Sequence, residues 1–319
     1  MTTDEREEVT LGGVRQAIRI RGTNRSNPVL LLMQQGPGLP IINEVRIFER
    51  LLHLEDDFTV VYWDQRGTGR SARRRRDQFE ISPARMVDDT VELLELLHTR
   101  FGGKTVVAGF SFGATFGAQA AVRRPDLVAA LVATGMDIDV PAAEAYTYDF
   151  VLRTARERGN RRAVRQLEKI GPPPHTGVKQ FTKRARWAMN FGGVTVGKSA
   201  TDILGSVLVS LVRSRDYPPL AVIRSVRGII ASQAALLPGL AGTDLVATLP
   251  ALDVPVVFVQ GRLDRVAPGE ATERLYESLT APSKRLVWLE NSAHTPHFDE
   301  PELFRRALLD VKAALTPPR

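Results

Sequence analysis

The chain has 319 residues, 43% hydrophobic and 25% charged, a composition typical of a soluble globular protein with room for a large domain and an insertion. The absence of cysteine excludes disulfide bonds and thiol catalysis, and the formal net charge of +7 is carried by residues 137–244, which hold 16 Lys and Arg against 9 Asp and Glu. Because no signal peptide is visible and the apolar run 204–212 is too short to span a membrane, we expect a cytoplasmic protein without a membrane partner.

Up to residue 135 the sequence alternates between strand and helix patterns. Residues 14–20 alternate apolar and polar side chains, as in an amphipathic edge strand, and residues 28–33 and 58–63 are short apolar runs typical of strands buried on both faces. The further segments expected before residue 135 are helices at 42–52, 83–101 and 114–123 and strands at 104–110 and 127–133. This order predicts a doubly wound, mostly parallel sheet.

Four consecutive arginines, residues 73–76, form the one dense run of charge. They follow a glycine-containing loop, and we interpret them as a solvated loop. Since no platform of interleaved aromatic and basic residues accompanies them, we expect no nucleic-acid partner.

The alternation of strands and helices stops after Gly135 and resumes near residue 254. The residues between have helical patterns and a Gly-Pro-Pro-Pro break, but no series of strands. Strand and helix patterns then return at 254–259, 270–279, 285–289 and 301–315. We therefore expect an α/β core made of residues 1–136 and 246–319, with a helical cap, residues 137–245, inserted after the sixth strand.

The segment Gly109-Phe110-Ser111-Phe112-Gly113 joins an apolar strand to a helix rich in small residues. This G-x-S-x-G pattern is typical of the nucleophile elbow of α/β-hydrolases, in which the serine lies on a strained turn and presents its Oγ above the sheet. The N–H group of Phe112 would then lie at a helix N-terminus and bind an oxyanion. A glycine-rich turn of another α/β fold has the same pattern, so the partners of the serine must decide between the two.

A serine nucleophile needs a histidine base and a carboxylate that orients it, and in this fold the chain order is serine, acid, histidine. Of the five histidines, His294 and His297 follow the last predicted strand, and His294 is the closer to it. Asp264 lies on the loop after the first strand that follows the cap, whereas Asp253 precedes that strand and would lie at the opposite edge of the sheet. We expect Ser111, Asp264 and His294 to form a catalytic triad.

Residues 63–71, with the sequence W-D-Q-R-G-T-G-R-S, resemble the proline iminopeptidase family, a serine-peptidase branch of the α/β-hydrolases. Further landmarks of that family match in the same order: Gly36-Pro37-Gly38, the elbow, the G-R-x-D loop with Asp264, and the histidine loop with Glu300-Pro301. The resemblance implies the α/β-hydrolase fold and serine-hydrolase chemistry, and we expect neither a cofactor nor a metal.

The resemblance also places residues around the site. The backbone N–H groups of Gln35 and Phe112 would form the oxyanion hole, and the side chains of residues 64–71 would hold a turn together. The residues expected to line the substrate pocket are Gln34, Gly36, Phe110, Trp187 and His297.

Two departures from the family bear on the substrate. Gln34-Gln35 replace the His-Gly of the family's H-G-G-P-G motif, and residues 184–191 lack the acidic group of its Trp-x-x-Trp-Glu segment, which helps to bind the substrate's α-amine. The cap is also net basic, which disfavours an ammonium group. We therefore predict that small acyl esters are hydrolysed more efficiently than prolyl amides, unless another acid such as Glu144, Asp149 or Asp202 binds the amine.

These patterns predict a serine hydrolase that forms an acyl-enzyme on a small-molecule or short-peptide amide or ester. The alternatives are a carboxylesterase or lactonase of a metabolite, and a lyase or cyclase that keeps the triad for proton transfer. A pure binding protein would not need an intact triad, and an epoxide hydrolase or dehalogenase is disfavoured because the elbow carries serine, not aspartate. The sequence leaves the substrate and the oligomeric state open.

Overall fold

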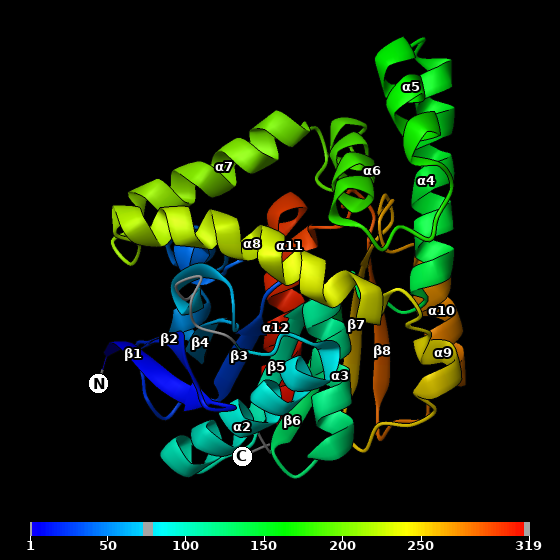
Figure 1. Ribbon diagram of the computed structural model, residues 1–319. Coiled ribbons are helices and arrows are strands. Elements are labelled where there is room, and N and C mark those ends of the chain that lie inside the picture. Colours follow the sequence, from blue (N-terminus) through cyan, green and yellow to red (C-terminus); the bar gives the residue numbers. More distant parts are fainter. Residues whose placement is uncertain (1, 73–78, 316–319) are drawn as a thin grey trace.

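The structure, a computed structural model, describes residues 2–72 and 79–315 (Figure 1). The four arginines at 73–76 lie outside the described residues. One mixed sheet crosses the molecule with helices on both faces, and a group of helices from the middle of the chain lies above it in Figure 1.

The sheet has eight strands in the order β1-β2-β4-β3-β5-β6-β7-β8. β2 pairs antiparallel with both β1 and β4, whereas all other neighbours are parallel. The strands are β1 Thr3–Leu11, β2 Val14–Gly22, β3 Val29–Met33, β4 Thr59–Asp64, β5 Thr105–Phe110, β6 Val128–Thr134, β7 Val256–Gly261 and β8 Lys284–Leu289. This arrangement confirms the predicted doubly wound, mostly parallel sheet.

Helices of the core cover both faces of the sheet. They are α1 Val45–Leu52, α2 Pro83–Phe101, α3 Phe112–Arg123, α9 Leu245–Thr248, α10 Gly269–Ser278, α11 Pro296–Asp299 and α12 Pro301–Leu315, with short 3-10 turns η1 Ile42–Glu44, η2 Leu54–Asp56 and η3 Gly69–Ser71. In β3, Leu30 and Leu32 pack in one apolar cluster with α1 and α12. Leu31 and Met33 pack in the other, with α2 and α3. The central strands are apolar throughout because both of their faces are covered.

Helix α2 shows how the local sequence fixes an element and what the element then positions. The Ser82 side chain accepts a hydrogen bond from Arg85 N at 3.2 Å, which caps the helix start, and Gly102 ends the helix with a φ of 75°. On its buried face α2 carries Asp89, which forms a fully buried ion pair with Arg66. Arg66 belongs to the turn after β4, so α2 helps to fix that turn beside the site.

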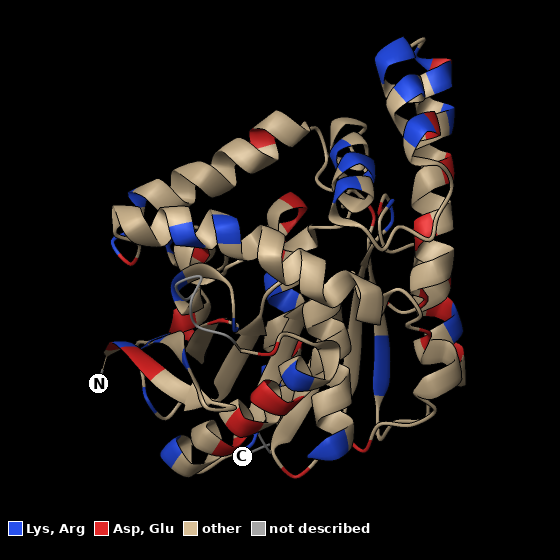
Figure 2. Ribbon diagram, viewed as in Figure 1, with Lys and Arg blue, Asp and Glu red and all other residues tan. Residues whose placement is uncertain are grey.

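Between β6 and β7 the chain forms a group of helices, the predicted cap. They are α4 Val140–Glu157, α5 Arg161–Ile170, α6 Val178–Asn190, α7 Ala200–Arg213 and α8 Pro219–Leu240. α4, α5 and α6 share a small apolar core that includes Tyr148, Leu167 and Trp187. Figure 2 shows Lys and Arg gathered on α5 and α6, in keeping with the basic charge of this segment. The bounds 137–245 for a separate cap remain a prediction.

Helix α8 lies against the turn after β4. A Cβ on Gly228 would lie 2.2 Å from the backbone oxygen of Gly67, so the two segments are in direct contact. Among the described residues, α8 is the one helix that is long and apolar enough to cross a membrane, judged by length and composition alone. Because it carries Arg224 and Arg227 and packs on the core, we interpret it as a cap helix.

The strands and helices predicted for the core lie within a few residues of observed ones, and the structure adds a strand, β1, at the N-terminus besides short helices and turns. β1 was not predicted, and it pairs along its whole length with β2. The expected edge strand at 14–20 is therefore the second strand of the sheet. β1 mixes charged and apolar residues, and its Glu5 and Glu7 both pair with Arg100 of α2.

Candidate active site

Ser111 lies on the tight turn between β5 and α3. Its backbone φ is 53° and its ψ is −128°, a conformation that residues other than glycine rarely adopt. Two glycines allow the turn, because a Cβ on Gly109 would lie 2.4 Å from Ala114 N and one on Gly113 would lie 2.4 Å from Gln34 O. The turn therefore has the geometry expected of a nucleophile elbow.

His294 and Asp264 form a hydrogen-bonded pair, with Nδ1 of His294 2.8 Å from Oδ2 of Asp264. The other carboxylate oxygen, Oδ1, accepts hydrogen bonds from Val266 N (2.7 Å) and Ala267 N (2.9 Å). The Gln260 side chain donates a longer bond, 3.3 Å, to Oδ2. These contacts fix the carboxylate, which in turn fixes the imidazole so that Nε2 points away from it.

The end of β6 brings the serine and the histidine to one place. Ser111 N donates to the backbone oxygen of Thr134 at 2.9 Å. The next residue, Gly135, has a φ of 50°, and a Cβ on it would lie 3.1 Å from Nδ1 of His294. Thr134 thus holds the backbone of Ser111 while Gly135 lies against the ring of His294, and the site is closed in, with Ser111 5% and His294 8% exposed.

A further carboxylate, which the sequence analysis did not identify, touches the expected nucleophile. Asp137, on the loop after β6, accepts a hydrogen bond from Ser111 Oγ at Oδ2, over 2.6 Å. Among the described residues, no hydrogen bond joins Ser111 to His294. The signal in the sequence was weak, because an aspartate three residues after a strand is common in loops.

The charges of the site act on one another. Burial raises the pKa of Asp137 to about 6, although the positive charge of His294 and the hydrogen bond from Ser111 act in the opposite direction. Burial lowers the pKa of His294, but the carboxylates of Asp264 and Asp137 outweigh that effect and raise it above the ordinary value. The Asp137 carboxylate therefore takes up a proton as the pH falls through about 6.

The loop that carries His294 is held by two acidic residues that follow it. Asp299 accepts a hydrogen bond from Ala293 N at 2.9 Å. Glu300 accepts one from Asn291 N at 2.9 Å and one from Ser292 Oγ at 2.6 Å. These bonds explain the part that Glu300, noted in the sequence, plays in holding the histidine loop.

His297, expected to line the substrate pocket, lies in an aromatic cluster next to the site. Its ring stacks on Phe48 at 5.6 Å between centroids, and lies 4.4 Å from the Phe110 ring and 4.2 Å from the Phe298 ring. Burial and the charge of His294 lower the pKa of His297 to about 3. The structure thus places both His297 and Phe110, a second expected pocket residue, in the apolar core as uncharged packing groups.

The loop after β3 brings Gln34 and Gln35 to the elbow. The Gln34 side chain turns into the neighbouring turn, where Oε1 accepts hydrogen bonds from Gln65 N and Thr68 Oγ1, both at 3.3 Å. Its Nε2 is buried and has no partner among the described residues. Gln35 is half-buried, and Gly36 has a φ of 150°. The part of this loop that packs against the first turn of α3 is therefore its main chain, and the Gln34 carboxamide oxygen points elsewhere.

The turn after β4 is held by its own side chains, as the sequence predicted. Oδ1 of Asp64 accepts hydrogen bonds from Ile41 N (2.9 Å) and Ile42 N (3.0 Å), and Oδ2 accepts one from Arg70 N at 2.8 Å. The hydroxyl of Tyr217, from the cap, also donates to Asp64. Asp64 therefore ties the loop after β3, its own turn and the cap together.

Trp187, a further expected pocket residue, belongs to the apolar core of the cap. Its Nε1 donates to Gln166 at 3.2 Å, and its ring stacks on Phe191. On the same helix, Arg184 forms a buried ion pair with Glu144 over 2.6 Å. The charge of Arg184 also lowers the pKa of the carboxylate that Ser111 contacts, so α6 bears on the site electrostatically.

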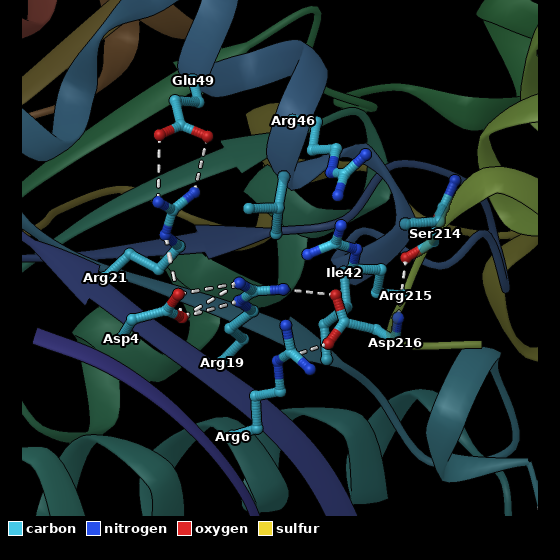
Figure 3. Close-up of a pocket in the computed structure, with 12 residues that line it drawn as sticks. Asp4, Arg6, Arg19, Arg21, Ile42, Arg46, Glu49, Ser214, Arg215 and Asp216 are labelled. Carbon is cyan, nitrogen blue, oxygen red and sulfur yellow. Dashed lines mark hydrogen bonds and ion pairs between the residues drawn. The ribbon is translucent and has the colours of Figure 1, made fainter. Parts of the chain in front are cut away.

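A pocket of about 240 Å³ lies away from these residues, where β1, β2 and α1 meet the α7–α8 connection (Figure 3). Arg6 and Arg19 both pair with Asp216 in its wall, whereas Arg46 and Arg215 are exposed at its rim. No residue of the expected triad lines it. In the part of the chain that the structure describes, no group of three or more His, Asp or Glu side chains is placed to hold a metal ion.

The profile of the alpha/beta hydrolase family matches residues 43–307. A Bacillus subtilis (strain 168) protein named "Probable aminopeptidase YbaC" is 29% identical over 304 residues, which cover 95% of this chain and 94% of that protein. The solved proline iminopeptidase of Mycobacterium smegmatis has a TM-score of 0.68 at 19% identity and matches over 98% of each chain. A proline iminopeptidase-related protein of Thermus thermophilus has a TM-score of 0.64 at 20% identity, over 99% of each chain. Because the family profile spans most of the sequence and the fold agrees, this protein belongs to the alpha/beta hydrolase family, which supports a hydrolase activity.

Proposed function

We propose that this protein is a serine hydrolase that forms an acyl-enzyme on a small amide or ester. The observation that carries the proposal is the hydrogen-bonded pair of His294 and Asp264, at 2.8 Å, on the loops beside a serine held in a strained strand–helix turn. This is the combination of nucleophile, base and orienting acid that acyl transfer requires.

In the proposed first half-reaction, Ser111 turns its hydroxyl from Asp137 to Nε2 of His294. Nε2 takes the proton while Oγ attacks the carbonyl carbon, and the backbone N–H groups of Phe112 and Gln35 bind the oxyanion. The histidine then gives its proton to the leaving nitrogen or oxygen, and the acyl group stays on Oγ. Asp264 holds the proton on Nδ1 throughout and stabilises the imidazolium.

In the second half-reaction, a water molecule gives its proton to Nε2 and attacks the acyl-enzyme carbonyl. Collapse of the intermediate releases the carboxylic acid and returns the proton to Ser111. Phe112 supports the role assigned to its N–H because it opens α3, where no preceding helical carbonyl is available as a partner. The close approach of Gly113 to the loop after β3 supports the role of Gln35.

The substrate proposed is a small molecule or a short peptide, and the proposed reaction uses no cofactor. The similarity to a protein named as an aminopeptidase favours an amide, whereas the basic cap favours a metabolite ester or lactone. Both reactions use the same two half-reactions, so the proposal does not depend on which bond is cleaved.

Burst kinetics test the proposal. With p-nitrophenyl acetate, the enzyme should release a burst of p-nitrophenol close to one equivalent per active site, followed by slower turnover. Ser111→Ala should remove both phases, and Ser206→Ala, an exposed serine on α7, should keep both. Turnover by Ser111→Ala at the wild-type rate would contradict the proposal.

An isotope experiment separates hydrolysis from the lyase or cyclase alternative. In water enriched in ¹⁸O, hydrolysis through an acyl-enzyme places one solvent oxygen in the carboxylic acid product. A lyase or cyclase product would carry none. A panel of aminoacyl anilides and acyl esters, assayed under the same conditions, then identifies the preferred bond.

A further inference from the structure

We propose that the cavity between β1, β2, α1 and the α7–α8 connection, residues 214–218, binds a phosphate group that is carried as a monoester (Figure 3). Arg46 of α1 and Arg215 of the connection hold the phosphate group between the core and the cap. The site is separate from the expected triad, so the inference goes beyond the proposed function and does not depend on it.

The charges that line the cavity do not balance. Among the described residues, five arginines and three acids line it. The three acids are paired with three of the arginines: Glu49 with Arg21 at 2.7 Å, Asp4 with Arg19 at 2.9 Å, and Asp216 with Arg6 at 2.9 Å. Arg46 and Arg215 have no ion pair or hydrogen bond within the part of the chain that the structure describes. The excess of two positive charges matches a phosphomonoester, which carries about −1.5 to −2 at pH 7.

The two unpaired guanidinium groups come from different elements and meet at the rim. In Figure 3 the side chains of Arg46 and Arg215 point toward the same part of the cavity, and both residues are exposed. Like charges in a concave site attract an anion strongly, because the protein walls focus the field. A carboxylate is satisfied by one guanidinium fork, whereas the three terminal oxygens of a phosphate group accept from two forks at once. The arrangement therefore favours a phosphate group.

The main chain that carries Arg215 is anchored by the next residue. Asp216 is 7% exposed, and its carboxylate pairs with Arg6 of β1 and Arg19 of β2. Its backbone oxygen accepts a hydrogen bond from Arg70 at 2.5 Å. Binding therefore has to order the side chain of Arg215 but not its backbone, which keeps the entropic cost of binding small.

The size and the lining of the cavity suit a small polar ligand. Its volume is about 240 Å³, whereas sites for drug-sized ligands measure roughly 300–1,000 Å³. Ile42 and Val45 are the apolar residues among those that line it. Two sources can supply the phosphate group: a soluble phosphomonoester, or phosphatidic acid in a membrane, since Val212 and Leu220 are exposed on either side of the connection.

A bound phosphate group links two elements that pack around the expected active site. α1 carries Phe48, whose ring stacks on His297 of α11. The connection carries Tyr217, whose hydroxyl donates to Asp64 in the turn after β4. A ligand held by both arginines therefore restrains the cap against the core on this side of the site.

Isothermal titration calorimetry with methyl phosphate, in low salt above pH 7, tests the site. The wild type should bind one equivalent, and acetate should bind about tenfold more weakly or less. Arg46→Gln and Arg215→Gln should each raise Kd about tenfold or more, because each removes charge-assisted hydrogen bonds. Arg50→Gln of α1 and Arg213→Gln of α7 are matched controls. Both arginines are exposed outside the cavity, so Kd should stay within a few-fold.

Two further measurements locate the ligand and identify its source. On binding methyl phosphate, hydrogen exchange should slow at residues 45–52 and 214–218, and Ser111→Ala should bind as the wild type does. Cosedimentation with phosphatidylcholine vesicles, with and without phosphatidic acid, distinguishes the sources. Vesicle binding that needs both phosphatidic acid and the two arginines indicates the lipid, and binding of methyl phosphate without vesicle binding indicates a soluble monoester. Either result supports the phosphate site.

The outcomes that would overturn the inference do not involve turnover. They are a wild type that binds neither methyl phosphate nor the vesicles, glutamine variants of Arg46 and Arg215 that bind as tightly as the two controls, and acetate that binds as tightly as methyl phosphate. Loss of binding in Ser111→Ala would also overturn it, because the ligand would then lie in the expected active site. An enzyme that binds methyl phosphate but fails every test of the serine mechanism would refute the proposed function and leave this site standing.

Discussion

Replacing Asp264 by asparagine tests how the structure sets the tautomer of His294. One side-chain oxygen of residue 264 accepts hydrogen bonds from Val266 N (2.7 Å) and Ala267 N (2.9 Å), so the oxygen of an asparagine amide must take this position. Its NH₂ group then faces Nδ1 of His294, which in the wild type lies 2.8 Å from a carboxylate oxygen. Two donors cannot face each other, so the imidazole moves its proton to Nε2 and can no longer accept the proton of the serine.

The size of the effect follows from this geometry. With the base in the wrong tautomer, kcat should fall about 10⁴-fold, which corresponds to about 5 kcal/mol of lost transition-state stabilisation. The two backbone hydrogen bonds that hold the acid loop survive the substitution. We therefore expect the free energy of unfolding to change by no more than about 1 kcal/mol, a shift of at most about 2 °C in Tm for a chain of this length.

The assay is the steady-state hydrolysis of p-nitrophenyl acetate, with thermal unfolding measured on the same samples. Asp253→Asn is the matched control, because Asp253 is exposed before β7 and the chemical change is identical. It should keep wild-type kcat. An Asp264→Asn enzyme that retains more than a tenth of the wild-type kcat, or a control that loses as much, would refute the assignment of the acid.

Two other results are expected. His294→Ala should lower kcat about 10⁴-fold, whereas His297→Ala, which removes a ring packed among phenylalanines, should mainly lower the free energy of unfolding, by about 2–4 kcal/mol in urea titrations. A larger loss of kcat in His297→Ala than in His294→Ala would contradict both roles. Gly113→Ala should lower kcat about 10²-fold or more, because the added Cβ pushes away the loop after β3 that carries Gln35, whereas Gly103→Ala, whose Cβ meets no other atom, should keep the wild-type kcat. Equal kcat values for the two variants would refute the contact between Gly113 and that loop.

Much of the fold could be predicted because most of the sheet is parallel and buried. A strand covered on both faces, such as residues 28–33, is a continuous apolar run that local sequence reveals. β1 could not be predicted in this way. Its charged residues Glu5 and Glu7 are satisfied by Arg100, which lies more than 90 residues further along the chain, and no local pattern records such a contact.

The expected triad could be chosen from the sequence because Ser111, Asp264 and His294 follow parallel strands in the order that the fold requires. Asp137 follows one too, but its contact with Ser111 depends on the path of the loop after β6. His297 was expected in the pocket because it is near His294 in sequence. Its place among aromatic rings depends on residues from α1, β5 and α12, which only the folded chain brings together.

Covalent labelling tests most directly whether Ser111 is the nucleophile. The enzyme is treated with a fluorophosphonate probe, digested and mapped by mass spectrometry, and residual hydrolysis is measured at each time point. We predict one adduct per chain, on Ser111, with loss of activity in proportion to labelling. Ser111→Ala should show no adduct and an unchanged Tm. An adduct on another residue that accounts for the lost activity, or undiminished labelling of Ser111→Ala, would contradict the account.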